Sequence, residues 1–129
     1  MYNSIWYYSL NKPYLSPPDE IFAPVWIFLY ITLAISLFIY MRTKTEQNKQ
    51  KGYTYFFIQL IFNLLWSPAF FIMSNIGLAL VLIIMLDIFT ILTIKEFYKI
   101  RKISAIILFS YLLWILFASY LNLAYYIIN

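Results

Sequence analysis

Four long apolar stretches, separated by short polar segments, dominate the pattern of hydrophobic and polar positions along the chain. They cover residues 21–41, 53–73, 76–94 and 103–128, and the one charged side chain within them is Asp87. Each stretch is close to the roughly 20 residues that an α-helix needs to cross a bilayer, and none alternates with the period of a barrel strand. The pattern therefore predicts an all-α fold, a polytopic membrane helix bundle with four transmembrane helices.

The segment before the first apolar stretch, residues 1–20, is polar and carries three prolines. Proline lacks a backbone N–H and disfavours a helical residue before it, so we expect no regular helix there. The aromatic residues of this segment suit the boundary between membrane and water. We therefore expect an interfacial loop at 1–20 that leads directly into the bundle, so that residues 1–129 form a single transmembrane domain.

The composition excludes an ordinary water-soluble domain, because 64% of the residues are hydrophobic and 11% are charged. The chain contains no cysteine and no histidine, which excludes a Cys/His zinc site, a Ser-His-Asp triad and a haem ligated by His or Cys. We therefore expect no metal site and no catalytic residue. The net charge of +4 comes from basic residues in short loops beside apolar stretches, which indicates membrane topology and not nucleic-acid binding.

The distribution of these basic residues predicts an orientation in the membrane. Of the nine Lys and Arg residues, four lie within 42–51 and four within 95–102. With four spans, both basic loops fall on one face of the membrane, and both chain termini fall on the other. The positive-inside rule then places the termini outside the cytoplasm, in a bacterial inner membrane.

Polar and aromatic residues of the second and fourth stretches recur at the spacing of a single helix face. Amides in hydrocarbon need hydrogen-bond partners, so both faces are expected to point toward protein or a cavity. Either the amides join helices by hydrogen bonds, or they belong to an aromatic-walled pocket for a flat, largely apolar ligand. The second stretch presents Gln59, Asn63, Trp66 and Phe70, and the fourth presents Tyr111, Trp114, Ala118, Asn122 and Tyr125.

Asp87, in the third stretch, allows two interpretations. A carboxyl group within a membrane span is a functional hypothesis by default, as a proton or cation site. Alternatively, it is a neutral acid that forms a hydrogen bond to a neighbouring helix. The first interpretation supports an alternative function for the whole chain, a small four-helix proton-coupled exporter that works as a dimer and uses Asp87.

Several motifs occur in series along the chain. They are WYYSLNKP at 6–13, FAPVW at 22–26, QLIFNLLWSP at 59–68, YLLW at 111–114 and FASYLN at 117–122. In this order they resemble the tryptophan-rich sensory protein family, also called the translocator protein or peripheral-type benzodiazepine receptor family. The resemblance implies an all-α membrane protein. Family members have five spanning helices, and the first precedes the Trp-Tyr loop. Because the loop begins at residue 6, we expect that helix to be absent here; either the assigned start of the chain is too late, or the chain is a four-helix variant.

The same resemblance implies a function and a site. Family members bind porphyrins, act as sensors, receptors or carriers in transport, and some promote light-dependent porphyrin breakdown, so any enzymatic role is at most a photo-oxidation. It implies a tetrapyrrole ligand such as protoporphyrin IX or a haem-like porphyrin, and a membrane-lipid environment. The missing first helix would leave one side of the bundle less covered, so we expect a homodimer in which a second copy packs there. A degenerate homologue that no longer binds a ligand is a further alternative. The implied ligand-binding residues are Tyr7, Trp26, Tyr30, Asn63, Trp66, Trp114 and Ala118, with Gln59, Asn122 and Asp87 in support.

Overall fold

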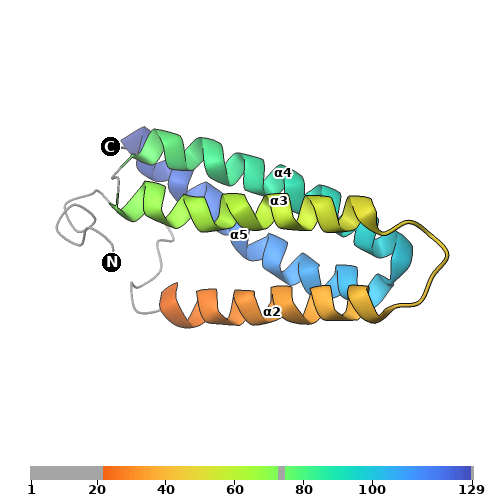
Figure 1. The fold of residues 1–129 in the computed structure, drawn as a ribbon. Helices are drawn as coiled ribbons and strands as arrows, with labels where there is room; N and C mark the ends of the chain where they lie inside the picture. Colours follow the sequence, from red (N-terminus) through yellow and green to blue (C-terminus); the bar gives the residue numbers. More distant parts are fainter. Residues whose placement is uncertain (1–21, 73–74, 129) are drawn as a thin grey trace.

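The computed structural model describes residues 22–72 and 75–128, and within these ranges the chain is helical, with short connections and no strand (Figure 1). This confirms the predicted all-α fold. The predicted loop at 1–20 lies outside the described residues. The helices are α2 (Phe22–Arg42), α3 (Gln50–Ser67) with the π-helical segment η2 (Pro68–Ile72), α4 (Ile76–Ile100) and α5 (Lys102–Ile128).

Two helices differ in length from the apolar stretches that predicted them. α3 begins at Gln50, three positions before the expected stretch, and α4 continues six positions beyond it, to Ile100. The extension of α4 carries Glu96 and Lys99, which form an ion pair of 3.1 Å one helical turn apart. Charged residues of this kind favour a helix and do not end it, so α4 extends beyond the apolar span that hydropathy detects.

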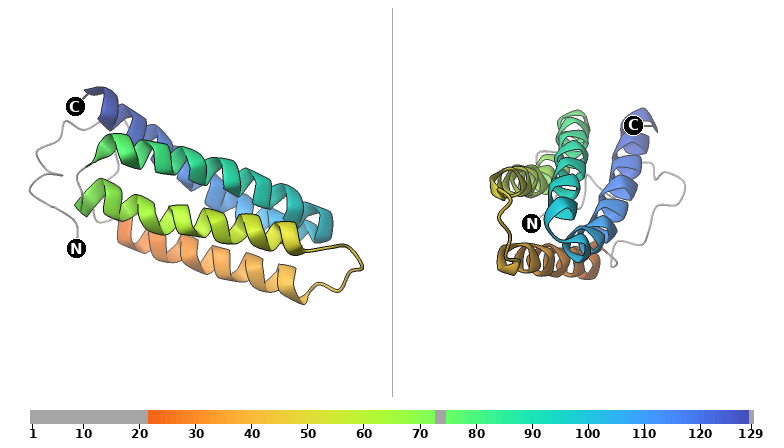
Figure 2. Two further views of the ribbon diagram at one scale, coloured as in Figure 1. Left: turned by 45° about the horizontal axis from the view of Figure 1, so that its top comes forward. Right: turned by 90° about the vertical axis from the view of Figure 1, so that its right-hand side faces the viewer.

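The four helices run side by side around a common interior (Figure 2). α4 packs between α3 and α5, and α2 packs against α5. Large apolar side chains also cover the outside of the bundle, which suits a lipid surround and not water. Outward-facing examples are Ile31 and Phe38 on α2, Ile61 and Leu64 on α3, Ile84 and Ile88 on α4, and Phe109 and Leu113 on α5.

Three of these helices, α2 from Pro24 onward, α4 and α5, are long and apolar enough to cross a membrane. α3 carries more polar side chains, and two of its amides, Gln59 and Asn63, are almost completely buried in the bundle. These polar side chains of α3 therefore face the protein interior, as expected for amides in a membrane protein.

A pair of serines joins α2 and α5 near the α2–α3 loop. The hydroxyl group of Ser36 donates to the carbonyl oxygen of Ser104 at 2.8 Å, and the hydroxyl of Ser104 donates to the carbonyl of Ser36 at 2.6 Å. Both residues are fully buried. Small side chains allow close approach of two helix backbones, and the reciprocal hydrogen bonds satisfy both hydroxyl groups without water.

Close packing around Tyr40 joins α2 to α3 and α4 at the same end of the bundle. The fully buried ring of Tyr40 stacks on Phe97, with ring centroids 3.9 Å apart, and meets the edge of Tyr53 at 5.2 Å. A Cβ atom at Gly52 would lie 2.3 Å from the Tyr40 hydroxyl oxygen. The absence of a side chain at Gly52 therefore makes room for the tyrosine.

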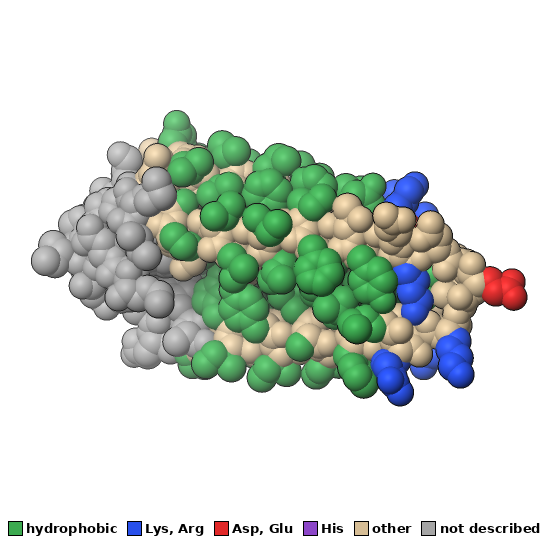
Figure 3. Space-filling model, in the orientation of Figure 1, with side chains coloured by type: hydrophobic (Ala, Val, Ile, Leu, Met, Phe, Trp, Pro, Cys, Tyr) green, Lys and Arg blue, Asp and Glu red, His purple; other side chains and the backbone are tan. Residues whose placement is uncertain are grey.

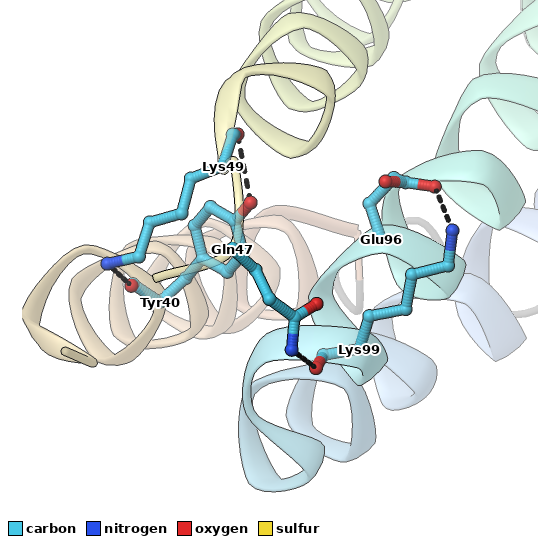
Figure 4. Close-up of polar contacts among 5 residues, drawn as sticks. All are labelled: Tyr40, Gln47, Lys49, Glu96 and Lys99. Atoms are coloured by element: carbon cyan, nitrogen blue, oxygen red, sulfur yellow. Dashed lines mark hydrogen bonds and ion pairs between the residues drawn. The ribbon is translucent and has the colours of Figure 1, made fainter. Parts of the chain in front are cut away.

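Side chains of the α2–α3 loop form hydrogen bonds to the C-terminal ends of α2 and α4 (Figure 4). The ammonium group of Lys49 donates to the carbonyl oxygens of Tyr40, Met41 and Thr43, and so caps the C-terminus of α2. The side-chain amide of Gln47 donates to the carbonyl of Lys99 at 3.4 Å. The positive charge of Lys49 is favourable there, because a helix C-terminus carries a partial negative charge.

Candidate ligand-binding site

A chain of hydrogen bonds crosses the interior of the bundle from α2 through α3 to α5. The hydroxyl of Tyr30 donates to the side-chain oxygen of Asn63 at 2.6 Å, and the Asn63 amide donates to the hydroxyl of Tyr111 at 2.7 Å. Tyr111 in turn donates to the side-chain oxygen of Gln59 at 2.9 Å. Asn63, Tyr111 and Gln59 are buried, so the structure brings residues from both predicted polar faces together.

A second polar contact lies further along the same faces. The indole N–H of Trp66 donates to the side-chain oxygen of Asn122 at 2.8 Å, and the Asn122 amide donates to the carbonyl oxygen of Ile76 at 3.1 Å. The carbonyl of Ile76 belongs to the first residue of α4. Asn122 therefore connects α5 to both α3 and α4, which is the helix-joining role that one interpretation of the sequence assigned to it.

Aromatic rings line the side of this region where α2 faces α3. The ring centroids of Trp26 and Trp66 are 5.7 Å apart, and those of Trp26 and Tyr30 are 6.3 Å apart. Phe70 continues the row, 5.7 Å from Trp66 and 5.6 Å from Tyr125. These distances are typical of aromatic pairs in protein cores, so the rings form a continuous apolar wall.

Two buried N–H groups, one on α3 and one on α5, have no hydrogen-bond acceptor within the described part of the chain. They are the side-chain amide nitrogen of Gln59 and the indole nitrogen of Trp114. The Trp114 ring contacts Phe117, with centroids 5.4 Å apart, and Ala118 is buried one helical turn further on. A buried donor without an acceptor is costly, and it marks a position where a ligand group can supply the missing acceptor.

Asp87 lies on α4 and points toward α5. One carboxyl oxygen accepts a hydrogen bond of 2.5 Å from the Ser119 hydroxyl, and the other is buried with no partner among the described residues. Ser119 also lies 2.8 Å from the carbonyl oxygen of Ile115 on its own helix. The geometry places Asp87 at the α4–α5 contact, outside the hydrogen-bond chain that begins at Tyr30.

Of the residues implied by the family resemblance, the structure therefore gathers Trp26, Tyr30, Asn63 and Trp66 in direct contact. Trp114 and Ala118 follow Tyr111 on α5, and Tyr7 lies outside the described residues. Sequence reasoning did not identify Ser119 as the partner of Asp87, because hydroxyl residues are common on membrane helices and the two lie 32 positions apart. No cluster of three potential His, Cys, Asp or Glu metal ligands occurs in residues 22–72 and 75–128.

These features define a class of protein, a polytopic helical membrane protein whose interior holds a cluster of aromatic and amide side chains. The chain belongs to the TspO/MBR family, whose family model matches residues 1–127. It is 44% identical over 124 residues to the tryptophan-rich protein TspO of Archaeoglobus fulgidus, an alignment that covers 96% of this chain and 80% of that protein.

Two other relatives extend the comparison. The tryptophan-rich protein TspO of Chlorobaculum tepidum is 42% identical over 119 residues, covering 91% of this chain and 75% of the relative. The translocator protein of Bos taurus is 30% identical over 119 residues, covering 91% of this chain and 70% of the relative. The family resemblance stated from sequence motifs is thereby confirmed, and the chain is that of an integral membrane protein.

Proposed function

We propose that this protein binds a tetrapyrrole, of the protoporphyrin IX or haem-like type, in the interior of its helix bundle, as a sensor or carrier. The observation that carries the proposal is the aromatic and amide cluster of α2, α3 and α5, together with two buried N–H donors on α3 and α5 that have no acceptor among the described residues. The names of two relatives, a tryptophan-rich sensory protein and a translocator protein, accord with sensing or transport.

The chemistry of the cluster suits a flat ring that carries carboxylates. The rings of Trp26 and Trp66 offer faces for stacking against a macrocycle. The N–H groups of Gln59 and Trp114, which meet no acceptor in residues 22–72 and 75–128, can each donate a charge-assisted hydrogen bond to a propionate oxygen. The chain has no His and no Cys to coordinate an iron, so affinity would come from stacking, burial and these donors.

In the structure the cluster is closed by its own contacts, since Tyr30 bonds to Asn63 and Trp26 touches Trp66. A ligand of porphyrin size would have to displace these side chains. The helix pair that contributes them, α2 and α3, shares few backbone contacts, whereas α2 packs broadly on α5. Separation of α2 from α3 at this level is therefore the least costly route by which the site would open.

A titration of the purified protein with protoporphyrin IX tests the proposal through the Soret absorbance band. We expect a saturable change, and we expect Trp114→Ala to weaken the affinity about tenfold through loss of ring contact and of an N–H donor. Phe109→Ala is the matched control, because it removes a lipid-facing ring from the same helix. The absence of saturation, or equal losses in both variants, would contradict the assignment of the pocket.

We further propose that α3 is the fourth membrane span and that both termini lie outside the cytoplasm of a bacterial inner membrane. The basic residues of the described chain gather at the end of the bundle that holds the α2–α3 loop, and α5 ends at the opposite end (Figure 3). The chain has no native cysteine, so single cysteines report topology. An impermeant thiol reagent added to intact cells should label Ile127→Cys and spare Thr45→Cys; the reverse pattern would refute the orientation.

A homodimer is proposed as the assembly. Ala34 is exposed on the outward face of α2, and a small residue on a lipid-facing helix permits the close backbone approach that drives helix association in membranes. Disulfide cross-linking of Ala34→Cys in membranes should give a dimer, and Ile61→Cys on the outward face of α3 is the control. Equal cross-linking of both variants would argue against a specific α2 contact.

A further inference from the structure

The basic end of the bundle contains cations in two different situations. Some already form hydrogen bonds or ion pairs within the protein: Lys49 caps α2, and Lys99 pairs with Glu96. Arg42 and Lys44, by contrast, are exposed and form no ion pair with any described residue. These two side chains are therefore available to an external anion.

Arg42 and Lys44 border an open depression between the end of α2 and the following loop. Its volume is about 630 Å³, which is within the range of small-molecule sites. Thr45, on its rim, accepts a hydrogen bond from the backbone N–H of Gln47, so its hydroxyl proton is free to donate. The lining is made of Met41, Arg42, Thr43, Lys44, Thr45, Gln47 and Lys49.

The Lys49 cap on α2 reduces the electrostatic repulsion that an anion in this depression would meet. The last carbonyl groups of a helix carry partial negative charge, which would repel a phosphate placed beside them. Here Lys49 donates to the carbonyl oxygens of Tyr40 and Met41, and its charge offsets that of the helix end. The net potential in the depression is then set by Arg42 and Lys44, with Glu46 as the acidic residue of the same loop.

An exposed apolar stripe leads along α2 to Arg42. Ile31, Ile35 and Phe38 precede Arg42 by eleven, seven and four positions, which is the spacing of a single helix face. The three apolar side chains are 53%, 46% and 62% exposed, and the Arg42 guanidinium lies 5.9 Å from the centre of the Phe38 ring. The stripe places hydrocarbon directly beneath a guanidinium group.

We propose that this depression binds the phosphate headgroup of an anionic phospholipid, with one acyl chain along the stripe of Ile31, Ile35 and Phe38. The planar guanidinium of Arg42 matches the two-oxygen geometry of a phosphodiester, and Lys44 and the Thr45 hydroxyl supply further donors. The occupant is a lipid and not a free anion, because the charged depression and the apolar stripe adjoin at the membrane boundary. The site is independent of the tetrapyrrole cluster. Ala34 shares the helix face of Ile31, Ile35 and Phe38, so a lipid chain on this stripe and an α2 contact between two copies of the chain would compete for the same surface.

Native mass spectrometry of the detergent-solubilised full chain tests the proposal, with dioleoyl-phosphatidylglycerol and dioleoyl-phosphatidylcholine as probes. We expect one phosphatidylglycerol molecule to bind at a much lower lipid concentration than any phosphatidylcholine molecule. The double variant R42Q/K44Q should weaken that first affinity about thirtyfold, from two basic contacts near a membrane surface. The matched variant K51Q/K95Q, which removes the same charge from exposed helix positions outside the depression, should leave it unchanged.

A variant that should raise the lipid affinity completes the test. E46Q removes the acidic side chain of the loop and should strengthen phosphatidylglycerol binding. Equal binding of the two lipids, or equal losses in the two double variants, would overturn the proposal. Binding of inorganic phosphate as tightly as phosphatidylglycerol would overturn the assignment to a lipid, because it would show that the stripe contributes nothing. The helix content measured by circular dichroism verifies that each variant folds.

Discussion

Replacement of Gly52 by alanine is expected to destabilise the protein, although alanine is the better helix former. The added Cβ atom would lie 2.3 Å from the hydroxyl oxygen of Tyr40, 2.7 Å from its Cζ atom and 3.3 Å from a ring carbon of Phe97. The first two distances are far below van der Waals contact. Tyr40 cannot move aside easily, because it is fully buried between Phe97 and Tyr53 and donates to the carbonyl of Lys49 at 2.9 Å.

The magnitude follows from three opposing contributions. Overpacking of a dense contact costs about 1–3 kcal/mol. Displacement of Tyr40 also loses its hydrogen bond to Lys49, a further cost of about 1 kcal/mol. The higher helix propensity of alanine returns at most about 1 kcal/mol, and less in the first turn of α3, where Gly52 lies. The net expectation is a loss of about 1–3 kcal/mol in the free energy of unfolding.

Unfolding in mixed micelles, followed by circular dichroism over a denaturing detergent gradient, measures this loss. Gly77→Ala is the matched control, because its Cβ atom would meet Tyr126 at 3.5 Å, an ordinary contact. That variant should be neutral or slightly stabilising. Removal of the hydroxyl with Tyr40→Phe should relieve part of the Gly52→Ala loss, so the double variant should lose less than the sum of the single variants. If Gly52→Ala is as stable as the parent chain, the packing argument is refuted.

Three further outcomes are expected. Ser36→Ala should cost about 0.6–1.7 kcal/mol in the same unfolding assay. The double variant with Ser104→Ala should lose less than the sum of the two single variants, because the two Oγ atoms also lie 3.1 Å from each other; additive losses would show that the two hydroxyl groups act separately. Lys49→Met keeps the side-chain stem over the Tyr40 ring but removes the ammonium cap, and should cost about 1 kcal/mol, whereas Lys44→Met should cost nothing measurable. Asp87→Asn retains an oxygen that accepts the hydroxyl of α5, so it should leave porphyrin affinity unchanged; a loss of affinity would place Asp87 in the ligand site.

The helical architecture could be predicted from sequence because apolar length alone sets it. The faces of α3 and α5 were also predictable, since the spacing of Gln59, Asn63 and Trp66 leaves one orientation in which none of them meets lipid. The extent of α4 was not predictable from hydropathy, because Lys95 and Glu96 lower the apolar character without ending the helix. Hydropathy detects the hydrocarbon-crossing part of a helix, not its backbone hydrogen bonds.

Contacts between distant residues could not be predicted from the single sequence. Tyr30 and Asn63 are 33 positions apart, and Ser36 and Ser104 are 68 positions apart. Helix spacing places each residue on a face, but the partner on another helix depends on crossing angles and relative depth in the membrane. The role of Lys49 was hidden for a different reason: in sequence it is one of several loop lysines, and only its geometry shows that it caps α2.

The hydrogen bonds from Tyr30 to Gln59 all point the same way. Each member gives its proton to the next, and the series ends at an amide whose own protons have no acceptor among the described residues. Such series are cooperative, because an acceptor at the last member polarises every bond before it. An acceptor bound beside Gln59 that left the Tyr30–Asn63 contact in place would therefore strengthen the hydrogen bond between Tyr30 and Asn63, and would hold α2 more firmly against α3. The mobility of α2 would then depend on whether the donor group of Gln59, deep in the bundle, has an acceptor.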